Sequence, residues 1–159
     1  MGLLDQYLRE AVEKMERDGI RLRILGDTGI LSPSLRELIR ETDEITEHVR
    51  GFQANICLNY GGRDEILRAA RRWAEIVRSG GENAPDEERF SSLLWSAGLP
   101  DPELLIRPGG EQRLSNFLLW QCAYSEFYFT DTLWPDFGPE ELDRAISAYR
   151  RRERRFGGI

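Results

Sequence analysis

The sequence predicts an α/β protein in which a parallel β-sheet is flanked by helices within a single domain. Short apolar runs alternate with amphipathic helical stretches along the chain, and this alternation is typical of parallel sheets with helical crossovers. The length of 159 residues suits one domain. The chain is 40% hydrophobic and 31% charged, which is the composition of a globular protein and not of a disordered one.

The first elements are marked by hydrophobic spacing and by capping residues. Apolar residues at helical spacing predict a helix over 3–19, and apolar and basic residues then alternate as in a strand over 20–25. Ser32 as a cap and Pro33 in the first turn predict a second helix over 32–49.

The same strand and helix patterns continue to the end of the chain. Gly61 and Gly62 separate a strand from a helix, and Pro139 opens the final helix. The expected elements are strands over 52–60, 103–106 and 126–131 and helices over 63–81, 84–100, 115–124 and 139–155. Ligands of such sheets bind at the carboxyl ends of the strands, where the loops begin.

Composition also bears on partners and on location. The net charge of −6 argues against non-specific binding of nucleic acid. No apolar run approaches the ~20 residues that span a bilayer, and we expect a cytoplasmic protein.

Cys57 and Cys122 lie in apolar contexts, which predicts buried free thiols in a reducing compartment. With a single histidine and no CxxC pattern, a zinc site has little support.

One stretch, RPGGEQRLSN, joins cationic side chains to flexible backbone. Arg107 follows an apolar strand, and Arg113 lies six residues later. Gly109 and Gly110 permit a tight turn and a close approach of a ligand to the main chain. Ser115 stands where a helix N-cap is expected, and a helix N-terminus offers free N–H groups. Because guanidinium forks match phosphate oxygens, the stretch predicts a site for a multiply charged anion, most naturally a diphosphate.

Simpler interpretations of these residues stay open. The two arginines could pair with the nearby acids Glu103 and Glu111, and the two glycines could form only a turn. Glu126 lies among aromatic residues in AYSEFYFTD. It is a candidate ligand of Mg²⁺, which favours carboxylates together with substrate phosphates, or else a strand glutamate that faces water.

The segment DPELLIRPGGEQRLSNFLLWQCAYSEFYFTDTLWPDF resembles the C-terminal signature of the cis-prenyltransferase family, and within it the undecaprenyl diphosphate synthases. LRILGDTG, LNYGGRDEI and RRERRFGG resemble three further segments in the family's order. The resemblance covers nearly the whole chain. It is specific, because the arginine, glycine, serine, aromatic and acidic positions of the long segment recur together.

The resemblance implies an isoprenyl transferase that condenses isopentenyl diphosphate onto an allylic diphosphate, usually farnesyl diphosphate, with Mg²⁺. The product would be a long cis-polyprenyl diphosphate, undecaprenyl diphosphate, which carries cell-wall precursors for peptidoglycan synthesis. Carried over by position, Arg107, Arg113 and Ser115, with the turn at Gly109 and Gly110, would hold the diphosphate of isopentenyl diphosphate. Glu126 would help to bind Mg²⁺.

The resemblance also concerns the C-terminal tail. Arg155 and Gly157 match an Arg-x-Gly motif that completes the isopentenyl site, in many members across a dimer interface. A homodimer is therefore expected, with self-association supported by the aromatic cluster between Phe117 and Phe137. Peripheral contact with the membrane would follow from the lipid product.

Two features depart from the family pattern. Pro108 stands where the family usually has threonine. The family's Met-Asp-Gly-Asn-Gly-Arg-Trp-Ala segment, with its metal-binding catalytic aspartate, does not occur in this sequence. Residues 1–159 are therefore expected to be the C-terminal portion of a single cis-prenyltransferase domain, with no catalytic residue of their own and little activity alone. The alternatives are a non-catalytic partner subunit, against which the intact arginine set counts, and an unrelated diphosphate-binding module, against which the length of the match counts.

Overall fold

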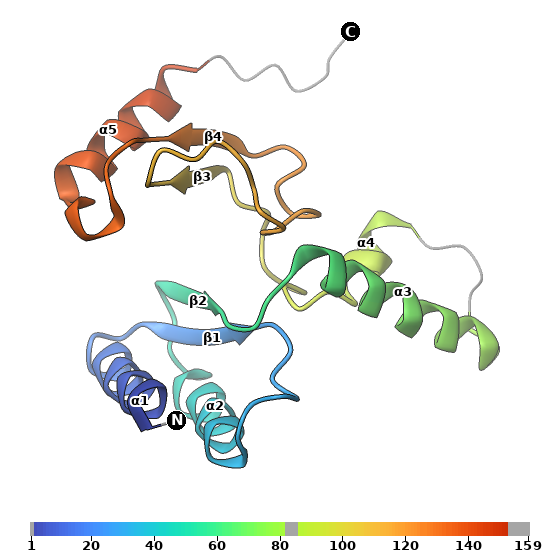
Figure 1. The fold of residues 1–159 in the computed structure, drawn as a ribbon. Helices are drawn as coiled ribbons and strands as arrows, with labels where there is room; N and C mark the ends of the chain where they lie inside the picture. Colours follow the sequence, from blue (N-terminus) through green and yellow to red (C-terminus); the bar gives the residue numbers. More distant parts are fainter. Residues whose placement is uncertain (1, 82–85, 153–159) are drawn as a thin grey trace, which may run out of the picture. The chain divides into compact units, whose positions relative to one another are not determined.

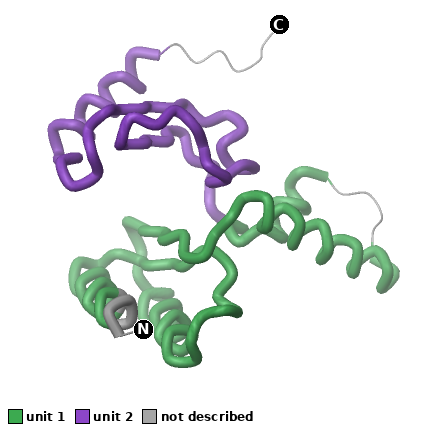
Figure 2. Tube along the Cα trace, in the orientation of Figure 1, with its two compact units in different colours: residues 1–97 green, residues 98–159 purple. Residues whose placement is uncertain are grey.

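The computed structural model describes residues 2–81 and 86–152 and divides the chain into two compact units, residues 1–97 and 98–159 (Figure 2). The elements of the first unit are α1 (Gly2–Arg17), β1 (Arg21–Leu25), α2 (Pro33–Thr46), β2 (Gln53–Cys57), α3 (Gly62–Arg78) and α4 (Glu87–Ser91). Those of the second are β3 (Leu104–Arg107), β4 (Glu126–Phe129), the 3₁₀ turn η1 (Trp134–Asp136) and α5 (Pro139–Arg150).

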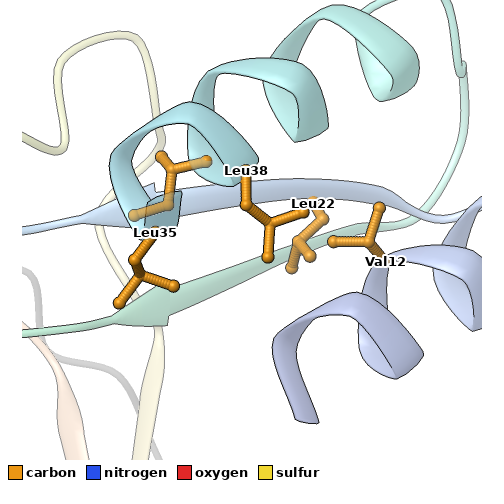
Figure 3. Close-up of a cluster of buried hydrophobic side chains, with 5 residues drawn as sticks. Val12, Leu22, Leu35 and Leu38 are labelled. Atoms are coloured by element: carbon orange, nitrogen blue, oxygen red, sulfur yellow. The ribbon is translucent and has the colours of Figure 1, made fainter. Parts of the chain in front are cut away.

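In the first unit, β1 and β2 pair in parallel, with Leu22 opposite Ala54 and Leu25 opposite Cys57. Helices α1 and α2 lie side by side against this strand pair (Figure 1). The side chains that fill the space between helices and strands form one buried cluster (Figure 3): Val12, Leu22, Leu35, Leu38 and Ile39. Removing these apolar side chains from water is the main stabilising contribution to this part of the unit.

Polar contacts fix α2 at both ends. The Ser32 hydroxyl accepts a hydrogen bond from the backbone N–H of Leu35, as predicted for the cap. At the other end, the fully buried Thr46 hydroxyl accepts from the N–H of Leu22 at 3.2 Å and lies 3.1 Å from the Leu22 carbonyl. This hydroxyl therefore ties the last turn of α2 to the backbone of β1.

In the second unit, β3 and β4 pair in parallel, with Leu104 opposite Glu126 and Arg107 opposite Phe129. Helix α5 packs on β4, and its last turn is held at the amino ends of the strands. There the Tyr149 hydroxyl donates to the Glu103 carboxylate.

The predicted α/β class with parallel strands flanked by helices is confirmed. The described strands form two separate two-stranded sheets, one in each unit. The expected helix over 84–100 is reduced to the five residues of α4, which Asp86 caps with its side chain, followed by turns. Among the described helices, none is both long enough and apolar enough to cross a bilayer.

The helix expected over 115–124 is wrong, because the structure has successive turns there. Ser115, Asn116 and Leu118 have positive φ angles of 47°, 68° and 43°. Left-handed residues of this kind interrupt a right-handed helix. The expected free N–H groups of a helix N-terminus at Ser115 are therefore absent from the described structure.

Candidate functional site

The candidate site lies at the carboxyl end of β3, where Arg107 is the last strand residue. The next turn is made by Gly109 and Gly110, whose φ angles are +94° and +77°, so the predicted turn is confirmed. Their N–H groups donate to the carbonyls of Thr132 and Thr130, each at 2.9 Å. These two N–H groups thus hold the loop against the segment after β4, and they are not turned toward a ligand.

The Arg107 guanidinium is fixed by three contacts. Nη1 donates to the carbonyl of Arg113 and, at 3.1 Å, to the hydroxyl of Ser115. Nη2 donates to Oε2 of Glu111 at 2.6 Å. Only 24% of the Arg107 side chain is exposed. The structure therefore brings Arg107, Arg113 and Ser115 together, as predicted, and uses the loop backbone to orient one guanidinium.

Glu111 is the acid that pairs with both arginines of this cluster. Its Oε2 atom contacts Nη2 of Arg107 and also Nη2 of Arg113. The alternative considered from the sequence, pairing of the arginines with a nearby acid, is thus confirmed for Glu111. The other candidate acid, Glu103, lies with Tyr149 at the opposite end of the strands.

An apolar hollow adjoins the arginines. It has a volume of about 190 Å³ and is lined by Arg107 and Arg113 together with four apolar side chains: Leu105, Ile106, Leu114 and Phe117. Phe117 was assigned to a helix, and its position in the hollow results from the left-handed turn at Ser115 and Asn116.

Glu126, the predicted metal ligand, lies away from the arginines. It is the first residue of β4 and pairs with Leu104, three residues before Arg107. Because a strand rises about 3.3 Å per residue, the two positions are separated by about 10 Å along the sheet. The Glu126 Oε2 atom accepts a hydrogen bond from Nη1 of Arg152 at 2.5 Å.

No described group of three or more His, Cys, Asp and Glu side chains could by itself hold a metal ion. A single carboxylate fits Mg²⁺ only when substrate oxygens complete the shell, which is how this ion is commonly bound. The tail residues Arg155 and Gly157 lie outside the described residues.

The two cysteines behave as structural thiols. Both are free, with Cys122 buried and Cys57 partly buried. Burial, with a smaller contribution from the charge of Glu65, raises the pKa of the Cys57 thiol to about 11. Burial also raises the pKa of Cys122.

Comparison with known proteins identifies similar sequences over the whole chain. A prenyltransferase family model described as "Putative undecaprenyl diphosphate synthase" matches residues 1–157. The isoprenyl transferase of Caulobacter vibrioides is 45% identical over 161 residues, covering 100% of this chain and 62% of that protein. The isoprenyl transferase of Rhizobium meliloti is 48% identical over 162 residues, covering 100% of this chain and 65% of that protein. The chain therefore spans a little under two thirds of the length of these relatives.

Solved structures show the same fold. The crystal structure of a "probable undecaprenyl diphosphate synthase" from Campylobacter jejuni matches with a TM-score of 0.84 and 42% identity, covering 99% of this chain and 72% of that one. Lavandulyl diphosphate synthase from Lavandula x intermedia, in complex with dimethylallyl diphosphate, matches with a TM-score of 0.91 and 38% identity, covering 97% and 68%.

Proposed function

The chain belongs to the undecaprenyl diphosphate synthase family of prenyltransferases, and we propose that it functions in an isoprenyl transferase reaction. In this reaction isopentenyl diphosphate is condensed onto an allylic diphosphate such as farnesyl diphosphate. The product is a long-chain cis-polyprenyl diphosphate, of which undecaprenyl diphosphate for cell-wall lipid carriers is the form that the family resemblance suggests.

The observation that carries this proposal is the junction of charge and apolar surface at the end of β3. Arg107 and Arg113 line the same hollow as Leu105 and Phe117, and the Ser115 hydroxyl lies 3.1 Å from Nη1 of Arg107. A diphosphate head needs cationic donors, and a five-carbon alkenyl tail needs an apolar surface. Isopentenyl diphosphate has both parts in one small molecule.

Within the reaction these residues would bind and orient the homoallylic substrate. Arg107 is already held by the Arg113 carbonyl and by Ser115, so little freedom is lost when its outer face meets a diphosphate. Fixing the alkene relative to the allylic partner is a large part of what such a site supplies, because a bimolecular step becomes effectively unimolecular. Arg113, with 62% of its side chain exposed, can adjust to the bound head group.

Mg²⁺ would be held with the help of Glu126, whose carboxylate is the hard oxygen donor that this ion prefers. When bound, the ion supplies charge neutralisation at the diphosphates. Because Arg152 occupies one carboxylate oxygen, Glu126 would bind through its other oxygen or exchange this partner. The tail residues Arg155 and Gly157, the homodimer and peripheral membrane contact belong to the same proposal and rest on the family resemblance. The cytoplasmic location also belongs to it and rests on the composition of the sequence.

Calorimetric titration with isopentenyl diphosphate tests the proposal. Arg113→Ala should weaken binding by about 1.5–3 kcal/mol, the range for hydrogen bonds to charged groups. Arg36→Ala is the control, since it removes an arginine that is also exposed from α2 and should leave affinity unchanged. Equal affinity in the wild type and in Arg113→Ala would contradict the assigned site. In the presence of Mg²⁺, Glu126→Gln should reduce the metal-dependent gain in affinity and leave metal-free binding intact.

A further inference from the structure

We propose that Glu111 is a built-in competitor of the substrate, a carboxylate that occupies the arginine pair until a diphosphate displaces it. The inference rests on the proposed function, since it concerns the same two arginines. In this role Glu111 weakens the binding of the ligand, whereas the two arginines strengthen it.

The geometry places the carboxylate where a phosphate oxygen would bind. A single atom, Oε2 of Glu111, contacts Nη2 of Arg107 at 2.6 Å and also contacts Nη2 of Arg113. One anionic oxygen shared between two guanidinium groups is the arrangement that a phosphate oxygen adopts between two arginines. Substrate and carboxylate therefore need the same donors.

Charge makes simultaneous occupancy unfavourable. The two guanidiniums carry two positive charges, and Glu111 cancels one of them. An incoming diphosphate would meet a carboxylate at hydrogen-bond distance from its own binding groups, and like charges at such distances repel strongly. The ligand must therefore drive Glu111 away, and the cost of breaking the two ion pairs is subtracted from its affinity.

The loop lets Glu111 leave without disturbing the rest of the site. Its side chain is 42% exposed, so the released carboxylate can be solvated at once. Arg107 keeps its contacts with the Arg113 carbonyl and the Ser115 hydroxyl when Glu111 moves, so this guanidinium stays oriented.

Such a competitor suits a reaction that is repeated on the same chain. After each condensation the elongated product carries the diphosphate that entered as isopentenyl diphosphate. This head group must leave the arginines before the next isopentenyl diphosphate can bind. A carboxylate that returns to the arginines lowers the affinity of the site for its own product and thereby favours release.

Binding of inorganic pyrophosphate and of inorganic phosphate at constant ionic strength tests the inference. Glu111→Gln keeps the size of the side chain but removes its charge. It should raise the affinity for both anions by roughly tenfold, which corresponds to about 1.4 kcal/mol of binding free energy. Both gains should be similar, because each anion displaces the same carboxylate. Glu140→Gln is the control, since it removes one negative charge from an exposed position of α5 in the same unit, and it should change either affinity less than twofold.

The double variant separates competition from a general charge effect. In an Arg113→Ala background, the gain from Glu111→Gln should shrink, because one of the two ion pairs that hold the carboxylate is already lost. Unchanged or weaker binding by Glu111→Gln, with pyrophosphate still bound by the wild type and weakened by Arg113→Ala, would overturn the competitor role and leave the proposed function standing. Absence of pyrophosphate binding in both the wild type and Glu111→Gln would overturn both.

Discussion

The Glu65 carboxylate accepts a hydrogen bond from the backbone N–H of Trp95 at 2.8 Å, across thirty residues of sequence. Glu65 is fully buried in α3, and its other oxygen accepts from the Tyr60 hydroxyl at 2.5 Å. A buried carboxylate is tolerated only when donors compensate for the lost water, and here the donors come from two separate segments. This side chain therefore joins the start of α3 to the turns that follow α4.

We expect Glu65→Gln to destabilise the protein. The amide can accept through one oxygen only, so its N–H₂ group would face either the Tyr60 hydroxyl or the N–H groups of Trp95 and Ser96, which now share one carboxylate oxygen. Leaving one buried donor without an acceptor costs about 1–3 kcal/mol. Urea unfolding followed by circular dichroism measures the loss. Glu75→Gln, on the exposed side of the same helix, is the control and should stay within about 0.5 kcal/mol of the wild type.

Thr46→Val should also lower stability, with the volume of the side chain preserved. The valine methyl would face the N–H and carbonyl of Leu22, which the Thr46 hydroxyl now contacts at 3.2 and 3.1 Å. The expected loss is about 1–3 kcal/mol, again from a buried donor left unpaired. Thr46→Ser keeps the hydroxyl and should lose less. If the valine variant were the more stable of the two, packing and not hydrogen bonding would dominate at this site.

Local patterns predict the parts of this fold that depend on local physics. The cap at Ser32 follows from the hydroxyl acceptor that serine supplies, and the proline starts of α2 and α5 follow from the fixed φ of proline. The four described strands follow from short apolar runs, of which only 20–25 alternates with basic residues, and they pair in parallel, as the strand–helix order implies. The resemblance to a family, and not periodicity, supplied the function.

The parts that were missed depend on tertiary contacts. The pattern of SNFLLWQCAY is helical, yet Ser115 bonds to Arg107 and the chain turns left-handed there. The glycine N–H groups were expected to face a ligand, but the carbonyls of Thr130 and Thr132 take them. These two carbonyls lie twenty or more residues from the glycines in the sequence, and nothing in the local pattern identifies them. The pairing of Glu111 with both arginines was one of two options that the sequence left open.

The thiol of Cys57 should react slowly with iodoacetamide. Burial raises its pKa from 9.0 to about 11, and only the thiolate is nucleophilic. At pH 8 the folded protein should therefore be alkylated roughly 100-fold more slowly than the urea-unfolded chain, as a shift of two pKa units implies. The raised folded pKa also means that this group favours the fold below pH 9 and that its contribution is lost as the pH rises through about 11. Mass spectrometry of peptides containing Cys57 gives the rate, and equal rates in both states would contradict the burial.

Gly26→Ala should be far more damaging than Gly51→Ala, although the two glycines have nearly the same φ angle. Their φ angles are +133° and +135°, so both alanines incur the strain of a region that L-residues avoid, of order 1–3 kcal/mol. A Cβ at Gly26 would also lie 2.0 Å from the carbonyl oxygen of Leu58, whereas one at Gly51 meets no described atom within 4 Å.

The obstacle at Gly26 is the backbone of Leu58, which cannot rotate away like a side chain. The clash is relieved only if the loop after β1 separates from the loop after β2. That movement would break the hydrogen bond from the Asn59 side chain to the Asp27 carbonyl at 2.8 Å. Urea midpoints of the two variants, compared with the wild type, isolate the steric contribution, because the strain is common to both. A Gly26→Ala protein as stable as Gly51→Ala would show that the two loops are not in contact in solution.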